Sequence, residues 1–163
     1  MTDQSRRRLL RAGLIFLAIP PGLVAAWILT APRSFYDDFP GGGREWVSAL
    51  PPYNEHLLRD YGAANLGFFV LLAGAALLLE RRLVQVALLA YAAAALPHFV
   101  YHVTTADAYS TSDNVLSLSS LALTVLLPLG LLLLTTERRI HGTHGGSDRG
   151  ARRPDHEAQL PAG

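Results

Sequence analysis

The chain has 163 residues, of which 50% are hydrophobic, a formal net charge of +1 and no cysteine. The absence of cysteine excludes disulfides, thiolate-ligated metals and iron–sulfur clusters held by this chain. The nearly balanced charge gives no reason to expect a nucleic-acid partner.

Four stretches contain no Asp, Glu, Lys or Arg, and they cover residues 12–32, 61–79, 83–106 and 114–136. A helix rises about 1.5 Å per residue, so about 20 apolar residues cross the hydrocarbon core of a bilayer. Within lipid, a helix satisfies its own backbone hydrogen bonds. The sequence therefore predicts an all-α protein whose residues 12–136 form a four-helix transmembrane bundle. Short connections favour an up-down-up-down order of the spans.

All 14 basic residues are arginine, and most of them fall on one predicted side of the membrane. They lie in residues 1–11, 81–82 and 138–153, whereas Arg33, Arg44 and Arg59 lie on the other side. Because cytoplasmic segments carry the excess of basic residues, both termini are predicted to face the cytoplasm.

The basic start followed by an apolar run could also be a signal peptide. Pro20, Pro21 and Gly22 interrupt that run, and Leu29-Thr30-Ala31 is a poor cleavage site. We therefore expect residues 1–11 to be a cytoplasmic start and the first span to be an uncleaved anchor. Residues 137–163 are rich in Gly, Arg and Asp, and they are expected to form a disordered cytoplasmic tail.

Residues 33–53 form a predicted outer loop that is rich in aromatic residues, glycine and proline. Such rings suit the depth of the lipid head groups, and residues 44–50 are long enough for one or two helical turns. The loop is either a cover that plugs the outer end of the bundle or a lid over a ligand site.

The start of the second span carries further local signals. Asn54 precedes Glu55 and is a plausible helix N-cap. Ala63, Gly67 and Gly74 predict a small-residue face at which another helix approaches closely.

One polar constellation stands out within the apolar segments. His98 and His102 are four positions apart near the outer end of the third span, and His56 and Asp60 have the same spacing at the outer start of the second. Residues four apart share a helix face, and polar groups at this depth must pair or face a cavity. We therefore expect these four groups to converge at the outer leaflet.

Three chemistries suit such a cluster: a His-ligated divalent metal, a haem held by imidazoles, or a proton relay around a bound quinone or lipid head group. A structural His–Asp network that fastens the second and third spans is the preferred interpretation of the four groups, and Arg59 beside Asp60 favours it. Asn65, Tyr91 and Tyr101 are the expected supporting polar residues.

Two segments carry a family resemblance: NEHLLRDYGAANLG at residues 54–67 and LPHFVYH at residues 96–102. They resemble the paired signatures of small four-span integral membrane proteins of actinobacteria, which implies a bacterial cytoplasmic membrane but no particular activity. More distantly, the layout is similar to DoxX-like membrane proteins. That second resemblance implies a quinone-linked redox role by analogy, without a matching catalytic residue.

The sequence thus predicts a small membrane binding or accessory protein with lipid around it and a membrane protein or a second copy as partner. The alternative is a haem-, metal- or quinone-linked oxidoreductase subunit. Transport by alternating access is disfavoured because the chain shows no internal repeat.

Overall fold

The computed structural model describes residues 2–136, and these residues are almost entirely helical. Four helices are long and apolar enough to cross a membrane: α1 (Asp3–Thr30), α3 (Glu55–Leu78), α4 (Arg81–Thr104) and α5 (Thr111–Thr136). The predicted all-α fold with four long apolar helices is confirmed. What we expected of the tail, residues 137–163, lies outside the described residues.

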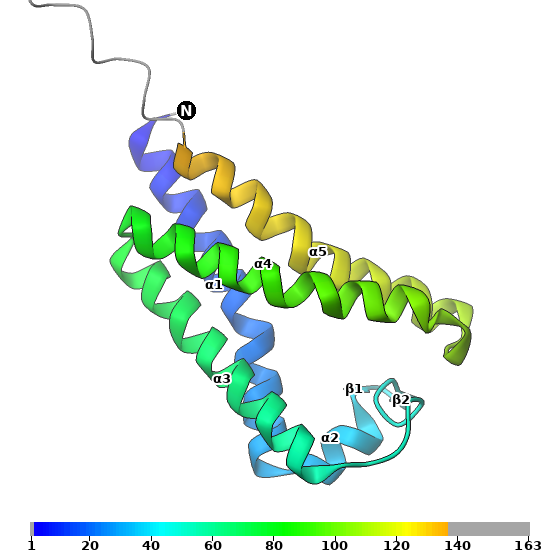
Figure 1. The fold of residues 1–163 in the computed structure, drawn as a ribbon. Coiled ribbons are helices and arrows are strands. Elements are labelled where there is room, and N and C mark those ends of the chain that lie inside the picture. Colours follow the sequence, from blue (N-terminus) through cyan, green and yellow to red (C-terminus); the bar gives the residue numbers. More distant parts are fainter. Residues whose placement is uncertain (1, 137–163) are drawn as a thin grey trace, which may run out of the picture.

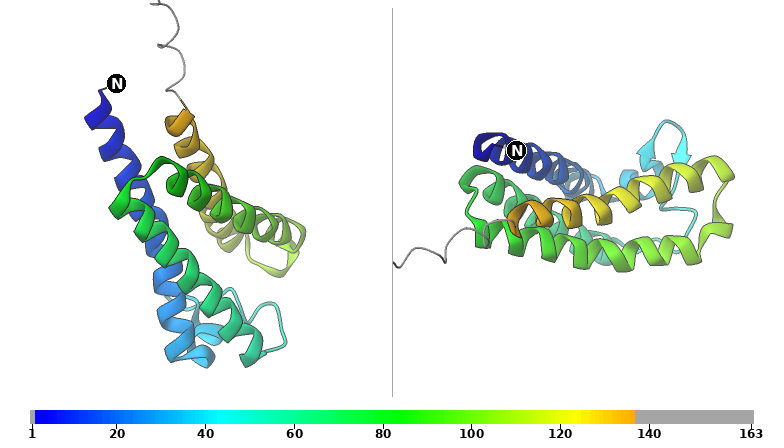
Figure 2. Two further views of the ribbon diagram at one scale, coloured as in Figure 1. Left: turned by 60° about the vertical axis from the view of Figure 1, so that its left-hand side comes forward. Right: turned by 90° about the horizontal axis from the view of Figure 1, so that it is seen from above.

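The four helices form two pairs, with α1 lying along α3 and α4 lying along α5 (Figure 1). The pairs meet at one end of the molecule and diverge toward the other, which Figure 2 shows from two further directions. At the meeting end, the Arg11 Nε donates to the Ala76 carbonyl at 3.1 Å, and the Gln85 Nε2 donates to the Thr135 hydroxyl at 3.0 Å. We call this the arginine-rich end and the opposite one the loop end.

The hydrophobic core lies toward the arginine-rich end, where all four long helices contribute buried side chains. Its largest members include Leu14, Leu17, Leu72, Leu88 and Leu131. Near the middle of the helices, α3 and α4 contact each other through large side chains, with the Phe68 and Tyr91 ring centroids 5.7 Å apart.

Many large apolar side chains face outward along the helices. Leu23, Leu77, Leu126 and Leu133 are each at least 65% exposed. Water would penalise so much contiguous apolar surface, whereas lipid would not. The described chain is therefore a multi-pass membrane protein with its helices in contact with lipid.

The close helix approach is not where the sequence pattern placed it. A methyl group built on Gly67 or Gly74 would meet nothing within 4 Å, so the predicted small-residue face is wrong. Among the glycines of α3, the tight contact is at Gly62, where such a methyl group would lie 2.8 Å from Ile28 Cγ2. Gly62 sits under α1, whereas Gly67 lies on a different face of the same helix.

The helix ends follow local sequence signals. The Asn54 side chain accepts a hydrogen bond from the Leu57 amide at 3.1 Å, so the predicted N-cap of α3 is confirmed. Thr2 caps α1 by accepting from the Ser5 amide, and the helix begins at Asp3. Residues 3–11 of the expected basic start form the first turns of α1.

The segment between α1 and α3 contains a short helix, α2 (Pro32–Asp38), and a small hairpin of β1 (Pro40–Gly41) and β2 (Arg44–Glu45). Gly41, Gly42 and Gly43 all have positive φ, which a tight turn requires and glycine adopts without strain. Residues 44–50 were expected to be long enough for one or two helical turns. β2 takes the first two of them, and a single helical turn follows, in which the Ala49 amide donates to the Glu45 carbonyl at 3.0 Å. The longer helix α2 forms earlier in the loop. Pro32 at the first turn favours that earlier start.

Candidate functional site

His98 and His102 share one face of α4, as their spacing predicts. Their ring centroids are 4.9 Å apart. The Tyr61 ring of α3 lies edge-on to His98 at 6.3 Å, and the Tyr109 ring, just before α5, stacks on His102 at 5.8 Å. Tyr101 completes the group, edge-on to His102 at 5.9 Å. We call these five residues the histidine–tyrosine cluster.

The cluster opens sideways and is not enclosed by the helices. His98, Tyr61 and Tyr101 are exposed at the surface of the helices, while His102 and Tyr109 are half-buried. The cluster is therefore accessible from the outer surface of the helices.

One atom in this cluster lacks the partner that its burial requires. The Nδ1 of His102 is buried and has no hydrogen-bond partner among the described residues. A buried polar nitrogen without a partner costs about 1–3 kcal/mol. Residues 2–136 therefore do not supply the hydrogen bond of this nitrogen.

His56 and Asp60 do not join the other two residues. The His56 Nε2 lies 3.4 Å from the Asp60 carboxylate on α3, and the two side chains are 89% and 65% exposed. Among residues 2–136, no three His, Asp or Glu side chains are placed to hold a metal ion together. The expected convergence of all four groups is therefore wrong: the structure divides them into two separate pairs.

The supporting residues have local partners of their own. Arg59 pairs with Glu55 at 2.8 Å, and the Asn65 amide donates to the Tyr61 carbonyl at 2.9 Å. Tyr91 is buried against Phe68, further along the seam between α3 and α4. Only Tyr101 of the supporting set belongs to the histidine–tyrosine cluster.

A contact between the two loops, which the sequence interpretation missed, closes the loop end above this cluster. Arg44 forms an ion pair with Asp113 at the start of α5, and the Trp46 Nε1 donates to the same carboxylate at 2.9 Å. The Tyr109 hydroxyl donates to the Trp46 carbonyl at 2.8 Å. We call Arg44, Trp46, Tyr109 and Asp113 the loop bridge.

Charge complementarity is the signal that could have indicated this bridge. The second outer loop contains Asp107 and Asp113 but no basic residue, and the first contains Arg44. Tyr109 belongs both to the bridge and to the cluster, and its partial burial raises the pKa of its hydroxyl, with the neighbouring Tyr101 adding to the effect. The bridge thus positions one of the rings that contact His102.

The four long apolar helices and the laterally open polar cluster define a polytopic membrane protein. No protein-family model, curated protein or solved structure matches this chain. The resemblances to four-span actinobacterial proteins and to DoxX-like proteins therefore stay predictions, and no activity is carried over from them.

Proposed function

We propose that this protein is a binding or accessory protein of the bacterial cytoplasmic membrane, and that the histidine–tyrosine cluster is its ligand site. The observation that carries the proposal is the buried, unpartnered Nδ1 of His102. A bound ligand would supply the missing hydrogen bond and so remove the free-energy cost of a buried nitrogen without a partner.

The surroundings of that atom indicate the class of ligand. Tyr109 and His98 offer aromatic faces beside His102, and the two imidazoles can each donate or accept a hydrogen bond. The cluster faces the lipid-exposed side of the helices. These features favour a membrane-dissolved molecule with a compact, oxygen-bearing head group, such as a quinone or a neutral lipid.

Orientation forms part of the same proposal. Eleven of the fourteen arginines lie in segments assigned to one side, and this asymmetry supports both termini in the cytoplasm and the histidine–tyrosine cluster at the outer leaflet. Reporter fusions after Gly42 and Thr111 should then be external, and fusions after Arg82 and Arg149 internal. The opposite result at any two of these sites would contradict the orientation.

The ligand site is tested by comparing His102→Phe with His56→Phe. The first change keeps a stacking ring but removes both nitrogens, and the second alters a histidine that is 89% exposed on another helix. Protein purified from its own membrane should release a bound small molecule from the wild type and from His56→Phe, as measured by extraction and mass spectrometry. His102→Phe should release much less of it.

Two further readings on the same samples separate ligand binding from a structural role. His102→Phe should unfold at the same temperature as ligand-free wild type or higher, because it removes a buried orphan atom. Lost stability with unchanged ligand content would show a structural histidine instead. A visible absorption band in the wild type that both variants keep would place a haem away from His102 and would contradict the assignment of this site.

A further inference from the structure

A second polar site lies at the arginine-rich end, far along the helices from the histidine–tyrosine cluster. A cavity of about 180 Å³ opens between the first turns of α1, the α3–α4 turn and the last turn of α5. Its polar lining consists of Asp3, Arg6, Arg7, Arg81 and Thr135, and its apolar lining of Leu10, Leu79, Val84 and Leu134.

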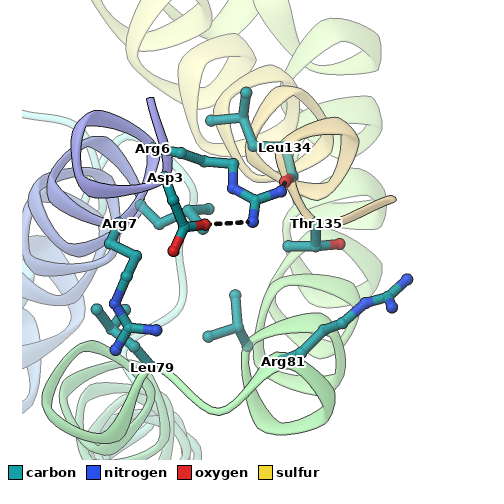
Figure 3. A pocket seen from close by; sticks show the side chains of 9 residues that line it. Asp3, Arg6, Arg7, Leu79, Arg81, Leu134 and Thr135 are labelled. Atoms are coloured by element: carbon teal, nitrogen blue, oxygen red, sulfur yellow. Dashed lines mark hydrogen bonds and ion pairs between the residues drawn. The ribbon is translucent and has the colours of Figure 1, made fainter. Parts of the chain in front are cut away.

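Arg6 is part of the cavity wall and is already held in place. Its side chain is only 18% exposed, and its guanidinium lies 2.9 Å from the Asp3 carboxylate and donates to the Leu134 carbonyl of α5 at 3.4 Å. Figure 3 shows this guanidinium at the centre of the view, between α1 and α5. Arg6 therefore links α1 to α5, and the negative charge of Asp3 balances the positive charge of Arg6.

Arg7 and Arg81 are in a different situation. They lie on either side of the cavity, with the Arg7 guanidinium beside Leu79 and the Arg81 side chain extending outward from α4 (Figure 3). Both residues are exposed, and within residues 2–136 neither guanidinium has an ion-pair or hydrogen-bond partner. The described residues that line the cavity thus carry a net positive charge, and the exposed Arg81 guanidinium points away from the cavity (Figure 3).

The apolar lining shows what kind of anion this site would suit. Val84 belongs to the hydrophobic core, and Leu10, Leu79 and Leu134 pack against that core, so apolar walls lie directly next to the polar mouth. A small free anion has no apolar part to place against such walls. A lipid, in contrast, carries an acyl chain next to its phosphate, as the cavity has apolar walls next to its polar mouth. Guanidinium groups bind phosphate oxygens through paired, charge-assisted hydrogen bonds.

We propose that this cavity binds the phosphate group of an anionic membrane lipid, with Arg7 and Arg81 closing on the phosphate oxygens from two helices. Basic cavities between the ends of transmembrane helices are suited to this class of head group. The site does not depend on the proposed function of the histidine–tyrosine cluster, nor on which side of the membrane the arginine-rich end occupies.

The test uses the full chain in nanodiscs of phosphatidylcholine to which phosphatidylglycerol is added, with bound lipid counted by native mass spectrometry. Arg7→Gln/Arg81→Gln is compared with Arg8→Gln/Arg82→Gln, which removes the same charge from neighbouring positions that do not line the cavity. We expect the first double variant to lose phosphatidylglycerol affinity by roughly 10- to 30-fold and the control by less than about threefold. Equal losses in the two variants would show diffuse surface attraction and overturn the proposal.

Two further measurements identify the source of the phosphate and check that the variants fold. Millimolar inorganic phosphate in phosphatidylcholine nanodiscs should neither bind the chain nor raise its melting temperature; tight binding of phosphate alone would overturn the lipid assignment. Both double variants should melt as the wild type does in pure phosphatidylcholine, because Arg7 and Arg81 are exposed and unpaired in the described chain. A large drop confined to the first double variant would show that these arginines serve the fold instead.

Discussion

Arg44, in the first outer loop, forms an ion pair with Asp113, which lies 69 residues later at the start of α5. The Asp113 carboxylate also accepts from Trp46 and, at 2.6 Å, from the Ser110 hydroxyl. This one side chain therefore joins the α1–α3 connection to the second helix pair at the end where the pairs diverge (Figure 1).

Asp113→Ala should lower the free energy of unfolding by about 1–3 kcal/mol, because Trp46 and Ser110 lose hydrogen bonds to a charged acceptor. Chemical or thermal unfolding in detergent measures the change. The matched control is Asp37→Ala, which breaks an ion pair with Arg33 whose side chains are 66% and 41% exposed. An exposed pair of this kind contributes at most about 1 kcal/mol, so a control effect as large as that of Asp113→Ala would argue against a special role for the bridge.

Gly62→Ala should destabilise the protein by about 1–3 kcal/mol, because its methyl group would meet Ile28 at 2.8 Å. Ile28 is fully buried and branches at Cβ, so it has little room to move. Gly67→Ala, on the same helix with open space around it, should be neutral or stabilising by up to about 1 kcal/mol. Melting temperatures in detergent compare them, and the reverse order would contradict the assigned packing of α1 on α3.

The loop bridge should weaken at alkaline pH through Tyr109. Burial raises the pKa of its hydroxyl, so the folded state holds this proton more tightly than the unfolded chain does. The stabilisation is present below about pH 10, the usual tyrosine value, and is lost as the pH rises through the higher folded value. Unfolding measured from pH 8 to 11 should show this loss in the wild type and a smaller one in Tyr109→Phe, which has neither the proton nor the bond to Trp46. Identical pH profiles would assign the loss to other groups.

Substitutions of Asp60 and His98 should be additive within about 0.5 kcal/mol, because the two residues share no partner in the described chain. Asp60 pairs with His56 on an exposed face of α3, and His98 contacts His102 and Tyr61. A double-mutant cycle tests this, in which the unfolding free energies of the wild type, both single Ala variants and the double variant are measured. A double variant that costs clearly less than the sum would restore the single network expected from the sequence.

The sequence by itself determined the local properties of the protein. Charge-free runs of sufficient length predicted four apolar helices, the Asn54-Glu55 pair predicted the start of α3, and the spacing of His98 and His102 placed both rings on one face. Each of these depends on interactions within a few residues along the chain, so composition and periodicity are enough to predict them.

Only the tertiary structure decided which helix faces meet. It shows that Gly62 and not Gly67 lies against α1, that His56 and Asp60 stand apart from His98 and His102, and that Arg44 reaches Asp113. The lipid-facing and the helix-packing faces of these helices are both mainly apolar, so hydrophobic periodicity cannot distinguish one from the other. The gathering of Arg7 and Arg81 at one cavity likewise follows from how α1 and α4 pack, which no spacing along the chain encodes.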